Sequence, residues 1–132
     1  MDVIVDTSVL IAVIANEPEK PALVALTSGA NLIAPGSVHW EIGNAFSAML
    51  RHKRITAAQA RQALEIYGGI PIRFVDVDLS RALEIADQLG IYAYDAYLIV
   101  CALQHKCALL ALDRGLVHSA NRAGVEVLEV AT

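Results

Sequence analysis

Short apolar runs alternate along the chain with longer segments in which apolar residues recur at helical spacing. A short apolar run bounded by turn residues is typical of a buried β-strand. Five segments have this form, and we expect a strand in each: Val3–Val5, Asn31–Pro35, Ile70–Val77, Cys107–Leu112 and Val125–Val130.

The segments between these runs are predicted to be helices. The clearest runs from Ser37 to His52, where one stripe at i, i+4, i+7, i+8 and i+11 is apolar: Val38, Ile42, Ala45, Phe46 and Met49. Asp78 is the expected N-cap of a later helix that Gly90 ends. The remaining helices are expected at Ser8–Ala15, Glu19–Gly29, Thr56–Tyr67, Gly90–Gln104 and Arg114–Gly124.

Strands that alternate with helices favour right-handed crossovers and a mostly parallel sheet. We therefore predict a three-layer α/β fold: a central, mostly parallel five-stranded sheet with helices on both faces, formed by one domain over residues 1–132. The hydrophobic content of 56% exceeds the usual ~45–50%. This excess fits a sheet covered on both faces, or a sizeable partner interface.

Charge and cysteine usage narrow the class of protein. A net charge of −4 argues against a protein that holds nucleic acid by bulk electrostatics, although it leaves room for a small local site. The two cysteines, Cys101 and Cys107, lack the spacing of a disulfide scaffold or a metal site, which indicates a reducing compartment. The N-terminus lacks the basic region of a signal peptide, and no apolar stretch is long enough to span a bilayer. We expect a cytoplasmic protein without membrane contact.

One carboxylate, Asp95, interrupts the very apolar segment "GIYAYDAYLIVCALQ" (Gly90–Gln104). A buried carboxylate without a partner is costly, and it normally protonates, pairs or binds a cation. Asp95 could instead cap a helix that begins at Ala96. The two tyrosines and the isoleucine just before it would then surround it with bulk that a cap at the surface does not need.

Three further acids are expected near the same edge of the sheet. Asp6 and Asp113 directly follow the first and fourth predicted strands, and Glu41 lies one turn into the helix after the second. The carboxyl ends of parallel strands form one edge of a sheet, where ligands usually bind. We therefore expect Asp6, Glu41, Asp95 and Asp113 to converge.

Structural roles for these acids are open alternatives. Asp is a favoured N-cap, so Asp6 and Asp113 could be helix caps that the topology alone brings to one edge. Glu41 could be an ordinary exposed residue. However, with Ser37 as the N-cap of its helix, the capping-box position is Trp40 and not Glu41.

Converging carboxylates would repel one another without a cation, and at least one pKa should rise. Mg²⁺ binds carboxylate oxygens and water and usually leaves positions open for a substrate phosphate, and Mn²⁺ suits the same ligands. Such a metal lowers the pKa of its bound water and neutralises charge on phosphate, which is chemistry suited to phosphodiester hydrolysis.

Four short segments carry these acids in order: "VDTSVLIA" with Asp6, "HWEIGNAF" with Glu41 and Asn44, "YDAYLIVCAL" with Asp95, and "LLALDRGL" with Asp113. Together they resemble the motifs of PIN-domain ribonucleases, in particular the VapC-type toxins of bacterial or archaeal toxin–antitoxin pairs. The resemblance covers the whole chain, and four motifs in order are far more specific than any one of them.

The resemblance implies an endoribonuclease dependent on Mg²⁺ or Mn²⁺, in which Asp6, Glu41 and Asp95 hold the metal and Asp113 assists. It also implies a homodimer that is inhibited by a cognate antitoxin protein, whose C-terminal segment covers the site. Family members often carry a hydroxyl residue two positions before the fourth acid, where this chain has Ala111. A hydrogen bond that orients Asp113 is therefore expected to be missing.

Four other residues are candidates for contact with the substrate: Thr7, Ser8, Asn44 and Arg114. The hydroxyls of Thr7 and Ser8 could position water or phosphate, or could simply belong to a helix start. Arg114 could touch a phosphate or lie free in solvent. The basic run Arg51–Arg54 either ends a helix favourably or contacts the RNA backbone.

The aromatic residues Trp40, Tyr92, Tyr94 and Tyr97 are expected in the core or in a dimer contact, with base stacking as the alternative. The competing function is a catalytically silent PIN-like module that binds protein or RNA, and the intact set of four acids favours the enzyme. A dehalogenase-like phosphatase would need an acid at the place of Ser8. A nucleotide-binding domain would need a glycine-rich turn after the first strand, which is absent.

Overall fold

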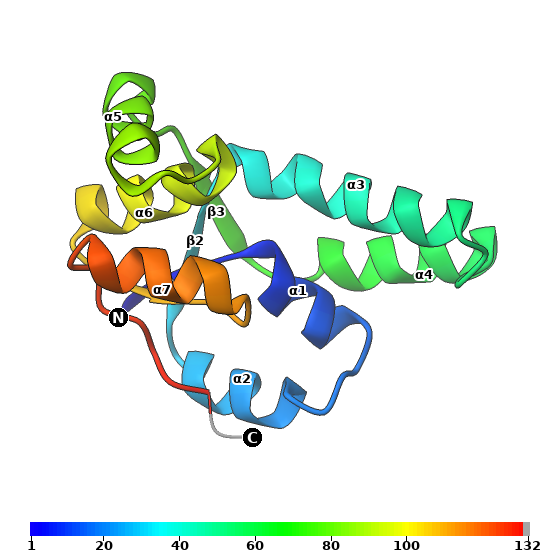
Figure 1. The fold of residues 1–132 in the computed structure, drawn as a ribbon. Helices are drawn as coiled ribbons and strands as arrows, with labels where there is room; N and C mark the ends of the chain where they lie inside the picture. The colour runs from blue at the N-terminus through cyan, green and yellow to red at the C-terminus, as the bar shows by residue number, and fades with distance from the viewer. Residues whose placement is uncertain (131–132) are drawn as a thin grey trace.

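A computed structural model describes residues 1–130 of the chain (Figure 1). The described residues form the strands β1 (Asp2–Val5), β2 (Asn31–Pro35), β3 (Ile72–Val75) and β4 (Ala108–Leu110). Their helices are α1 (Thr7–Ile14), α2 (Lys20–Thr27), α3 (Gly36–Arg51), α4 (Ala57–Gly68), α5 (Leu79–Leu89), α6 (Ala93–His105) and α7 (Arg114–Arg122). None of the helices in this part of the chain combines the length and apolarity needed to cross a membrane.

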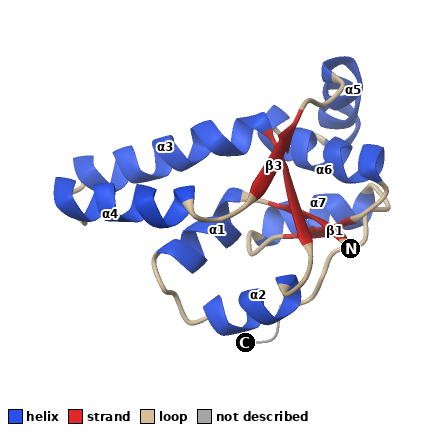
Figure 2. Ribbon diagram, turned by 180° about the vertical axis from the view of Figure 1, so that it is seen from behind, coloured by secondary structure: helices blue, strands red, loops and turns tan. Residues whose placement is uncertain are grey.

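The four strands form one parallel sheet in the order β3–β2–β1–β4. Figure 2 shows the strands in red among the surrounding helices. Successive side chains of a strand point to opposite faces of the sheet. Val3, Ile4 and Val5 of β1 are all at most 1% exposed, so both faces of the sheet are covered there. Helix α6 packs against β1, β2 and β4. The predicted α/β fold around a parallel sheet is confirmed.

The predicted fifth strand, Val125–Val130, is wrong. In the described residues this segment makes a single parallel bridge, from Val127 to Leu109 of β4. Its ladder is limited to hydrogen bonds from Leu109 N–H to the Glu126 carbonyl and from Leu128 N–H to the Leu109 carbonyl. Because β4 has only three residues, it offers too short an edge for a longer strand. The apolar residues of the segment pack on the core without regular pairing.

Helix ends follow the sequence signals at most positions. Thr56 and Gln59 form a reciprocal capping box at the start of α4. Asp78 caps α5, and Gly90 ends it with a left-handed φ of 66°. The predicted N-cap Ser37 is wrong, because α3 begins at Gly36 and Pro35 occupies the cap position without a side-chain hydrogen bond.

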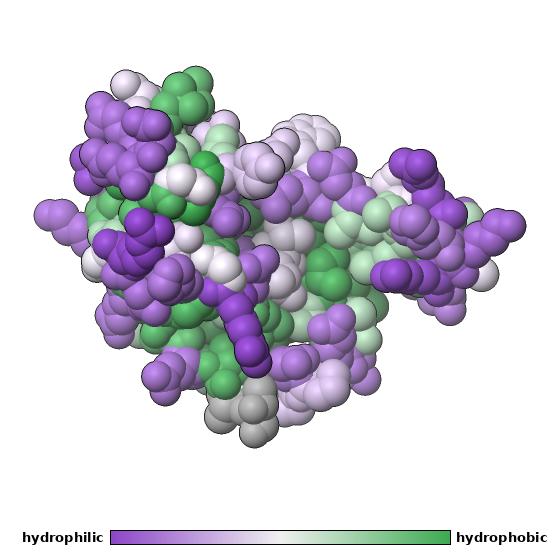
Figure 3. Space-filling view, viewed as in Figure 1, coloured by the Kyte–Doolittle hydropathy of each residue, from purple (hydrophilic) through white to green (hydrophobic). Residues whose placement is uncertain are grey.

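The hairpin of α3 and α4 projects from the rest of the molecule (Figure 1). Figure 3 shows hydrophilic residues gathered over its tip. The basic run lies there: Arg51 is the last residue of α3, and the residues from Arg51 to Arg54 are all exposed. The run therefore does end a helix, and its side chains are free to meet solvent or a polyanion.

Candidate metal-binding nuclease site

The four acids predicted from sequence lie at the starts of four helices. Asp6 follows β1 and caps α1, and Asp113 follows β4 and caps α7. Glu41 lies in the second turn of α3, and Asp95 in the first turn of α6. The N-terminal ends of these helices face the same central region of the molecule, above the carboxyl ends of the strands (Figure 1).

Asp6 is the most buried of the four, with 5% of its surface exposed. Its carboxylate accepts a hydrogen bond from Ser8 Oγ, at 2.8 Å from Oδ1 and 2.9 Å from Oδ2. The Val9 N–H also donates to Oδ1, at 3.2 Å. Burial raises the pKa of Asp6 from its ordinary 3.8 to about 6, and the charges of Asp113 and Glu41 add to the rise, against the lowering effect of these hydrogen bonds.

Glu41 has one engaged and one free carboxylate oxygen. Its Oε2 accepts a hydrogen bond from Thr7 Oγ1 at 3.2 Å. Its Oε1 is buried and has no hydrogen-bond partner among the described residues. Burial raises the pKa of Glu41, the Thr7 hydrogen bond lowers it, and the charge of Asp95 raises it further. A buried carboxylate oxygen without a partner is an acceptor that a cation would satisfy.

Asp95 is not the cap of its helix, because α6 begins at Ala93 with Tyr92 in the cap position. Burial raises the pKa of Asp95, and the charge of Asp113 raises it further. Asp95 is only half-buried, and the expected enclosure by tyrosines is wrong: Tyr92 is 88% exposed and Tyr94 is 54% exposed.

Charge interactions that affect the pKa values of three of the acids connect all four of them in a ring, which we call the acidic ring. Asp6 is affected by Glu41 and Asp113, Glu41 by Asp95, and Asp95 by Asp113. Within residues 1–130, however, no three acidic, histidine or cysteine side chains form a ready-made metal site. The pKa effects and the absence of a ready-made site are consistent with each other. Two carboxylates can raise each other's pKa at separations much longer than the roughly 2.0–2.6 Å of a metal–oxygen bond. The acids are near neighbours whose oxygens do not yet meet at one point.

Asp6 and Asp113 do cap their helices, as one of the alternatives predicted. Each accepts a backbone N–H of its own helix, from Val9 to Asp6 and from Leu116 to Asp113. In Asp113 this bond involves Oδ1 alone. A cap fixes the direction of a carboxylate and leaves lone pairs available, so capping is compatible with binding a cation.

Ser8 links Asp6 by hydrogen bonds to the loop that carries Asp113. Ser8 Oγ donates to Asp6, and it also accepts the N–H of Leu112 at 3.1 Å, next to Asp113. The sequence predicted that this loop would lack a hydrogen bond, because it has Ala111 in place of a hydroxyl residue. Ser8 of α1 supplies a hydrogen bond to the same loop. This role of Ser8 was not predicted, and the only signal for it is a serine two positions after Asp6. Its hydroxyl hydrogen is engaged, so Ser8 does not offer it to a phosphate in this conformation.

The other candidate residues differ in their placement. Thr7 contacts Glu41 directly. Asn44 is exposed on α3, one turn after Glu41. Arg114 is exposed and lines a separate cavity of about 640 Å³ together with Glu19. The structure therefore brings Thr7 into the acidic site, puts Asn44 beside it, and turns Arg114 partly to another surface.

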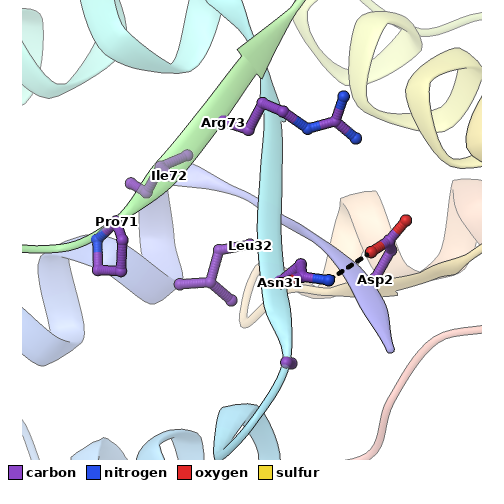
Figure 4. Close-up of a pocket in the computed structure, with 7 residues that line it drawn as sticks. Asp2, Asn31, Leu32, Pro71, Ile72 and Arg73 are labelled. Atoms are coloured by element: carbon purple, nitrogen blue, oxygen red, sulfur yellow. Dashed lines mark hydrogen bonds between the residues drawn. The ribbon is translucent and has the colours of Figure 1, made fainter.

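A pocket of about 550 Å³ lies at the opposite edge of the sheet, at the amino ends of β1, β2 and β3 (Figure 4). Asp2, Asn31 and Arg73 are its polar residues, and the Asn31 amide donates to Asp2 across 3.1 Å. None of the four acids lines it. Ligands of parallel α/β sheets bind at the carboxyl edge, so the candidate site is the acidic surface and not this pocket.

A family model described as the PIN domain matches residues 3–121 of this chain. The chain belongs to the PIN-domain family, as its four motifs indicated. A comparison with curated proteins found no significant match.

Solved structures share the fold at low sequence identity. PAE2754 from Pyrobaculum aerophilum is 22% identical with a TM-score of 0.72, over 96% of this chain and 83% of that one. VapBC2 from Rickettsia felis, bound to a DNA fragment from its promoter, is 13% identical with a TM-score of 0.69, over 99% and 100%. VapC20 from Mycobacterium tuberculosis, a toxin that cleaves the sarcin–ricin loop, is 16% identical with a TM-score of 0.62, over 89% and 94%.

Proposed function

We propose that this chain is an endoribonuclease dependent on Mg²⁺, with Mn²⁺ as a substitute, and that it acts as the toxin of a toxin–antitoxin pair. The observation that carries the proposal is the ring of Asp6, Glu41, Asp95 and Asp113 at the carboxyl edge of the sheet, in which burial and neighbouring acids raise the pKa values of Asp6, Glu41 and Asp95. Perturbed acids gathered at one edge are typical of a functional site.

The donor set suits a hard divalent cation. It consists of carboxylate oxygens, one of which, Glu41 Oε1, is buried without a partner among the described residues. Mg²⁺ and Mn²⁺ prefer such oxygen ligands. Asp6, Glu41 and Asp95 would hold the metal, and Asp113 would assist. When bound, the metal supplies a water of lowered pKa and neutralises charge on the phosphate.

The protein's own residues prepare this site. Ser8 and the Val9 N–H fix the carboxylate of Asp6, and Thr7 fixes that of Glu41. Partners of this kind orient metal ligands and tune their basicity. Asn44 and Arg114 would contact the RNA from the exposed rim, where their side chains meet solvent.

The assignment as a toxin rests on likeness to solved toxins. VapBC2, VapC20 and FitAcB from Neisseria gonorrhoeae share this fold over most of their length. By analogy with these toxin–antitoxin complexes we propose a cognate antitoxin partner for this chain. The resemblance of its motifs to VapC-type toxins further leads us to propose a homodimer and a cytoplasmic location, with residues 1–132 as a single PIN domain. The large exposed side chains Tyr92 and Leu79 provide surface for such protein contacts.

The second candidate is a catalytically silent PIN-like module that binds protein or RNA. The observation in its favour is that no three acidic, histidine or cysteine side chains of residues 1–130 form a ready-made metal site. The raised pKa values of Asp6, Glu41 and Asp95 favour the enzyme, because acids that lie far apart would not raise one another's pKa.

Calorimetric titration of Mn²⁺ into the metal-free protein tests the proposal, after removal of any partner that purifies with it. Asp95→Asn keeps the shape of the side chain and removes its charge. If Asp95 only interacts with the dipole at the start of α6, the metal-free variant melts lower, since such charges stabilise by about 0.3–1 kcal/mol. If Asp95 belongs to a repulsive cluster, the variant melts at the same or a higher temperature and loses Mn²⁺ binding.

Asp87→Asn, at an exposed position in the last turn of α5, is the control and should leave Mn²⁺ binding unchanged. Cleavage of total RNA in Mg²⁺ follows as the second measurement. A wild-type protein that binds no Mn²⁺ and melts like Asp95→Asn would contradict the enzyme and favour the binding module.

A further inference from the structure

The tip of the α3–α4 hairpin carries only positive charge. Residues 42–64, which span most of α3, the turn after it and the first two turns of α4, contain no acid. They contain four of the ten lysines and arginines, which we call the basic tip: Arg51, Lys53, Arg54 and Arg61. The other residues of the chain carry six cations against all 14 acids. An acidic protein thus presents a local cluster of cations on the part that projects from it (Figure 1).

The backbone of the basic tip is held at both ends. Helix α3 ends in a Schellman motif, in which the Lys53 N–H donates to the Leu50 carbonyl at 3.1 Å. The Arg54 N–H donates to the Met49 carbonyl at 2.9 Å, and Lys53 takes the left-handed φ of 55° that the motif requires. Two residues later, Thr56 starts α4 with its capping box. The cations therefore stand on an ordered turn, so an anion that binds there pays little for ordering the backbone.

Helix stability accounts for only part of this charge. Arg51 lies in the last turn of α3, where the helix dipole favours a cation. Arg54 lies two residues before Thr56, the N-cap of α4, where the dipole of the second helix disfavours one. Arg61 lies in the second turn of α4 and gains nothing from either helix end. Like charges gathered at one place also repel one another, and a polyanion would relieve that repulsion.

An exposed strip of α3 connects the acidic ring to the basic tip. From Glu41, steps of three, four and three residues lead to Asn44, Ala48 and Arg51, and residues at this spacing are neighbours on a helix surface. Asn44, Ala48 and Arg51 are all exposed. Glu41 and Arg51 are ten residues apart, which is about 15 Å along the helix axis. At about 3.4 Å for each stacked nucleotide, a strand of about four or five nucleotides covers this distance.

We propose that the basic tip is a second RNA-binding site, which contacts phosphates of the substrate at about four or five nucleotides from the bond that is cleaved. The inference rests on the proposed ribonuclease function and adds to it a site that holds the RNA at a distance from the metal. Arginine and lysine bind phosphate oxygens, and such contacts fix the position of a nucleic acid without reading its sequence. The basic tip offers charge and no aromatic ring, so it contacts the backbone and not the bases.

Binding of RNA at a series of salt concentrations tests this. For single-stranded RNA, the logarithm of the affinity falls with the logarithm of the salt concentration, with a slope of about −0.7 for each neutralised phosphate. The main variant combines Arg51→Gln, Arg54→Gln and Arg61→Gln, all at exposed positions. We expect its slope to be shallower by about 2 and its affinity in low salt to be at least about tenfold weaker. Fluorescence anisotropy with labelled RNA, in Ca²⁺ to avoid turnover, measures both.

Replacing the same three arginines with lysine separates charge from shape. Counterion release depends on charge, so a combined Arg51→Lys, Arg54→Lys and Arg61→Lys variant should keep the wild-type slope. The length of the RNA locates the contact. Wild-type affinity should rise steeply once the RNA is longer than about five nucleotides, because only then does it reach from the acidic ring to the basic tip. The glutamine variant of the tip should lack this rise.

The matched control combines Arg73→Gln, Arg81→Gln and Lys106→Gln, which removes three exposed cations outside the basic tip. It has the same net charge as the glutamine variant of the tip, and it should keep both the wild-type slope and the rise with length. Both glutamine variants should melt close to the wild type, since substitutions at exposed positions usually change stability little.

A glutamine variant of the tip that keeps the wild-type slope and the rise with length would overturn the proposal and leave the cations to an acidic protein surface. Equal losses in this variant and in the control would also overturn it, because the effect would then come from net charge. The result is separable from the nuclease test, since binding in Ca²⁺ needs no cleavage. A protein that binds RNA through the basic tip and cleaves none would refute only the proposed function.

Discussion

The hydroxyl of Thr7 donates a hydrogen bond to Glu41 Oε2 across 3.2 Å and so joins the first turn of α1 to the second turn of α3. The two residues are 34 positions apart in the chain. The bond leaves the other oxygen of Glu41, Oε1, buried and unpaired within the described part of the chain. One side of this carboxylate is thus fixed by the protein, and the other side is available to a cation.

Replacing Thr7 with valine should weaken metal binding more than it weakens the fold. Valine keeps the branched shape and removes the donor, so Glu41 Oε2 loses its anchor and the carboxylate its orientation. Losing a group that orients a metal ligand typically costs roughly 10–100-fold in metal affinity, and we expect a loss near the lower end. Calorimetric titration with Mn²⁺ measures it. Thr7→Ser, which keeps the hydroxyl, should restore most of the affinity; equal weakening in both variants would contradict this role.

Replacing Ser8 with alanine should destabilise the protein even without metal. Ser8 donates to Asp6 and accepts from the Leu112 N–H. A hydrogen bond to a charged group contributes about 1.5–3 kcal/mol, so a loss of about 2 kcal/mol is expected in urea unfolding near pH 7. Ser80→Ala, on the exposed side of α5, should unfold like the wild type. An unchanged unfolding midpoint for Ser8→Ala would show that its two bonds are not important for stability.

The pKa of Asp6 predicts how the stability of the metal-free protein depends on pH. Its folded pKa is raised from 3.8 to about 6, so between these values the folded state binds more protons than the unfolded state. Stability therefore falls as pH rises from about 4 to 6 and stays lowered above 6. A shift of about two units, at 1.36 kcal/mol each, sets the order of magnitude at about 3 kcal/mol.

Asp6→Asn removes this titration and keeps a residue that can cap α1. Without metal, the variant should melt above the wild type at pH 7 and close to it at pH 4. The burial of Glu41 and Asp95 raises their pKa values in the same direction, so the variant should keep a shallower dependence on pH. Thermal melts from pH 4 to pH 8 measure both curves. A wild type that gains stability between pH 4 and 7 would mean that Asp6 is stabilised as a carboxylate.

The placement of the acids was predictable because it follows from topology. In a parallel sheet, residues directly after the strands meet at one edge, and this placed Asp6 and Asp113 correctly relative to β1 and β4. The local signals at Thr56, Asp78 and Gly90 were also sufficient, because a cap depends on neighbouring residues alone.

Features that depend on distant residues were not predictable. Ser37 has the right chemistry for an N-cap, but Pro35 takes that position because its φ of −65° and its extended ψ suit the start of α3. The apolar pattern of the segment after α7 suggested a strand, but the shortness of β4 prevents one. The bond from Leu112 to Ser8 spans 104 positions, and no local pattern contains it.

Trp40, like Tyr92 and Tyr94, does not pack in the core, so the part of the expectation that placed these side chains there is wrong. It is 73% exposed on α3. The residues one turn away on either side, where side chains would lean on the indole, are small or polar: Gly36, Ser37, Gly43 and Asn44. A Cβ at either glycine would meet no atom within 4 Å. The glycines are therefore not required by packing. The His39 ring meets the indole with centroids 5.0 Å apart and planes at 73°, and the glycines leave the rest of the indole open.

Because Asn44 lies one turn from both Trp40 and Glu41, the open indole and the acidic ring belong to one surface. We expect Trp40→Ala to weaken the binding of single-stranded RNA about tenfold, within the roughly 1–3 kcal/mol that stacking of one base contributes. Its melting temperature should stay unchanged, since little of the side chain is buried. Fluorescence anisotropy with labelled RNA, in Ca²⁺ to avoid turnover, measures the affinity, and Trp40→Phe should retain most of it. If Trp40→Ala instead binds RNA normally and sediments as a smaller species than the wild type, the indole serves a contact between copies and not the RNA.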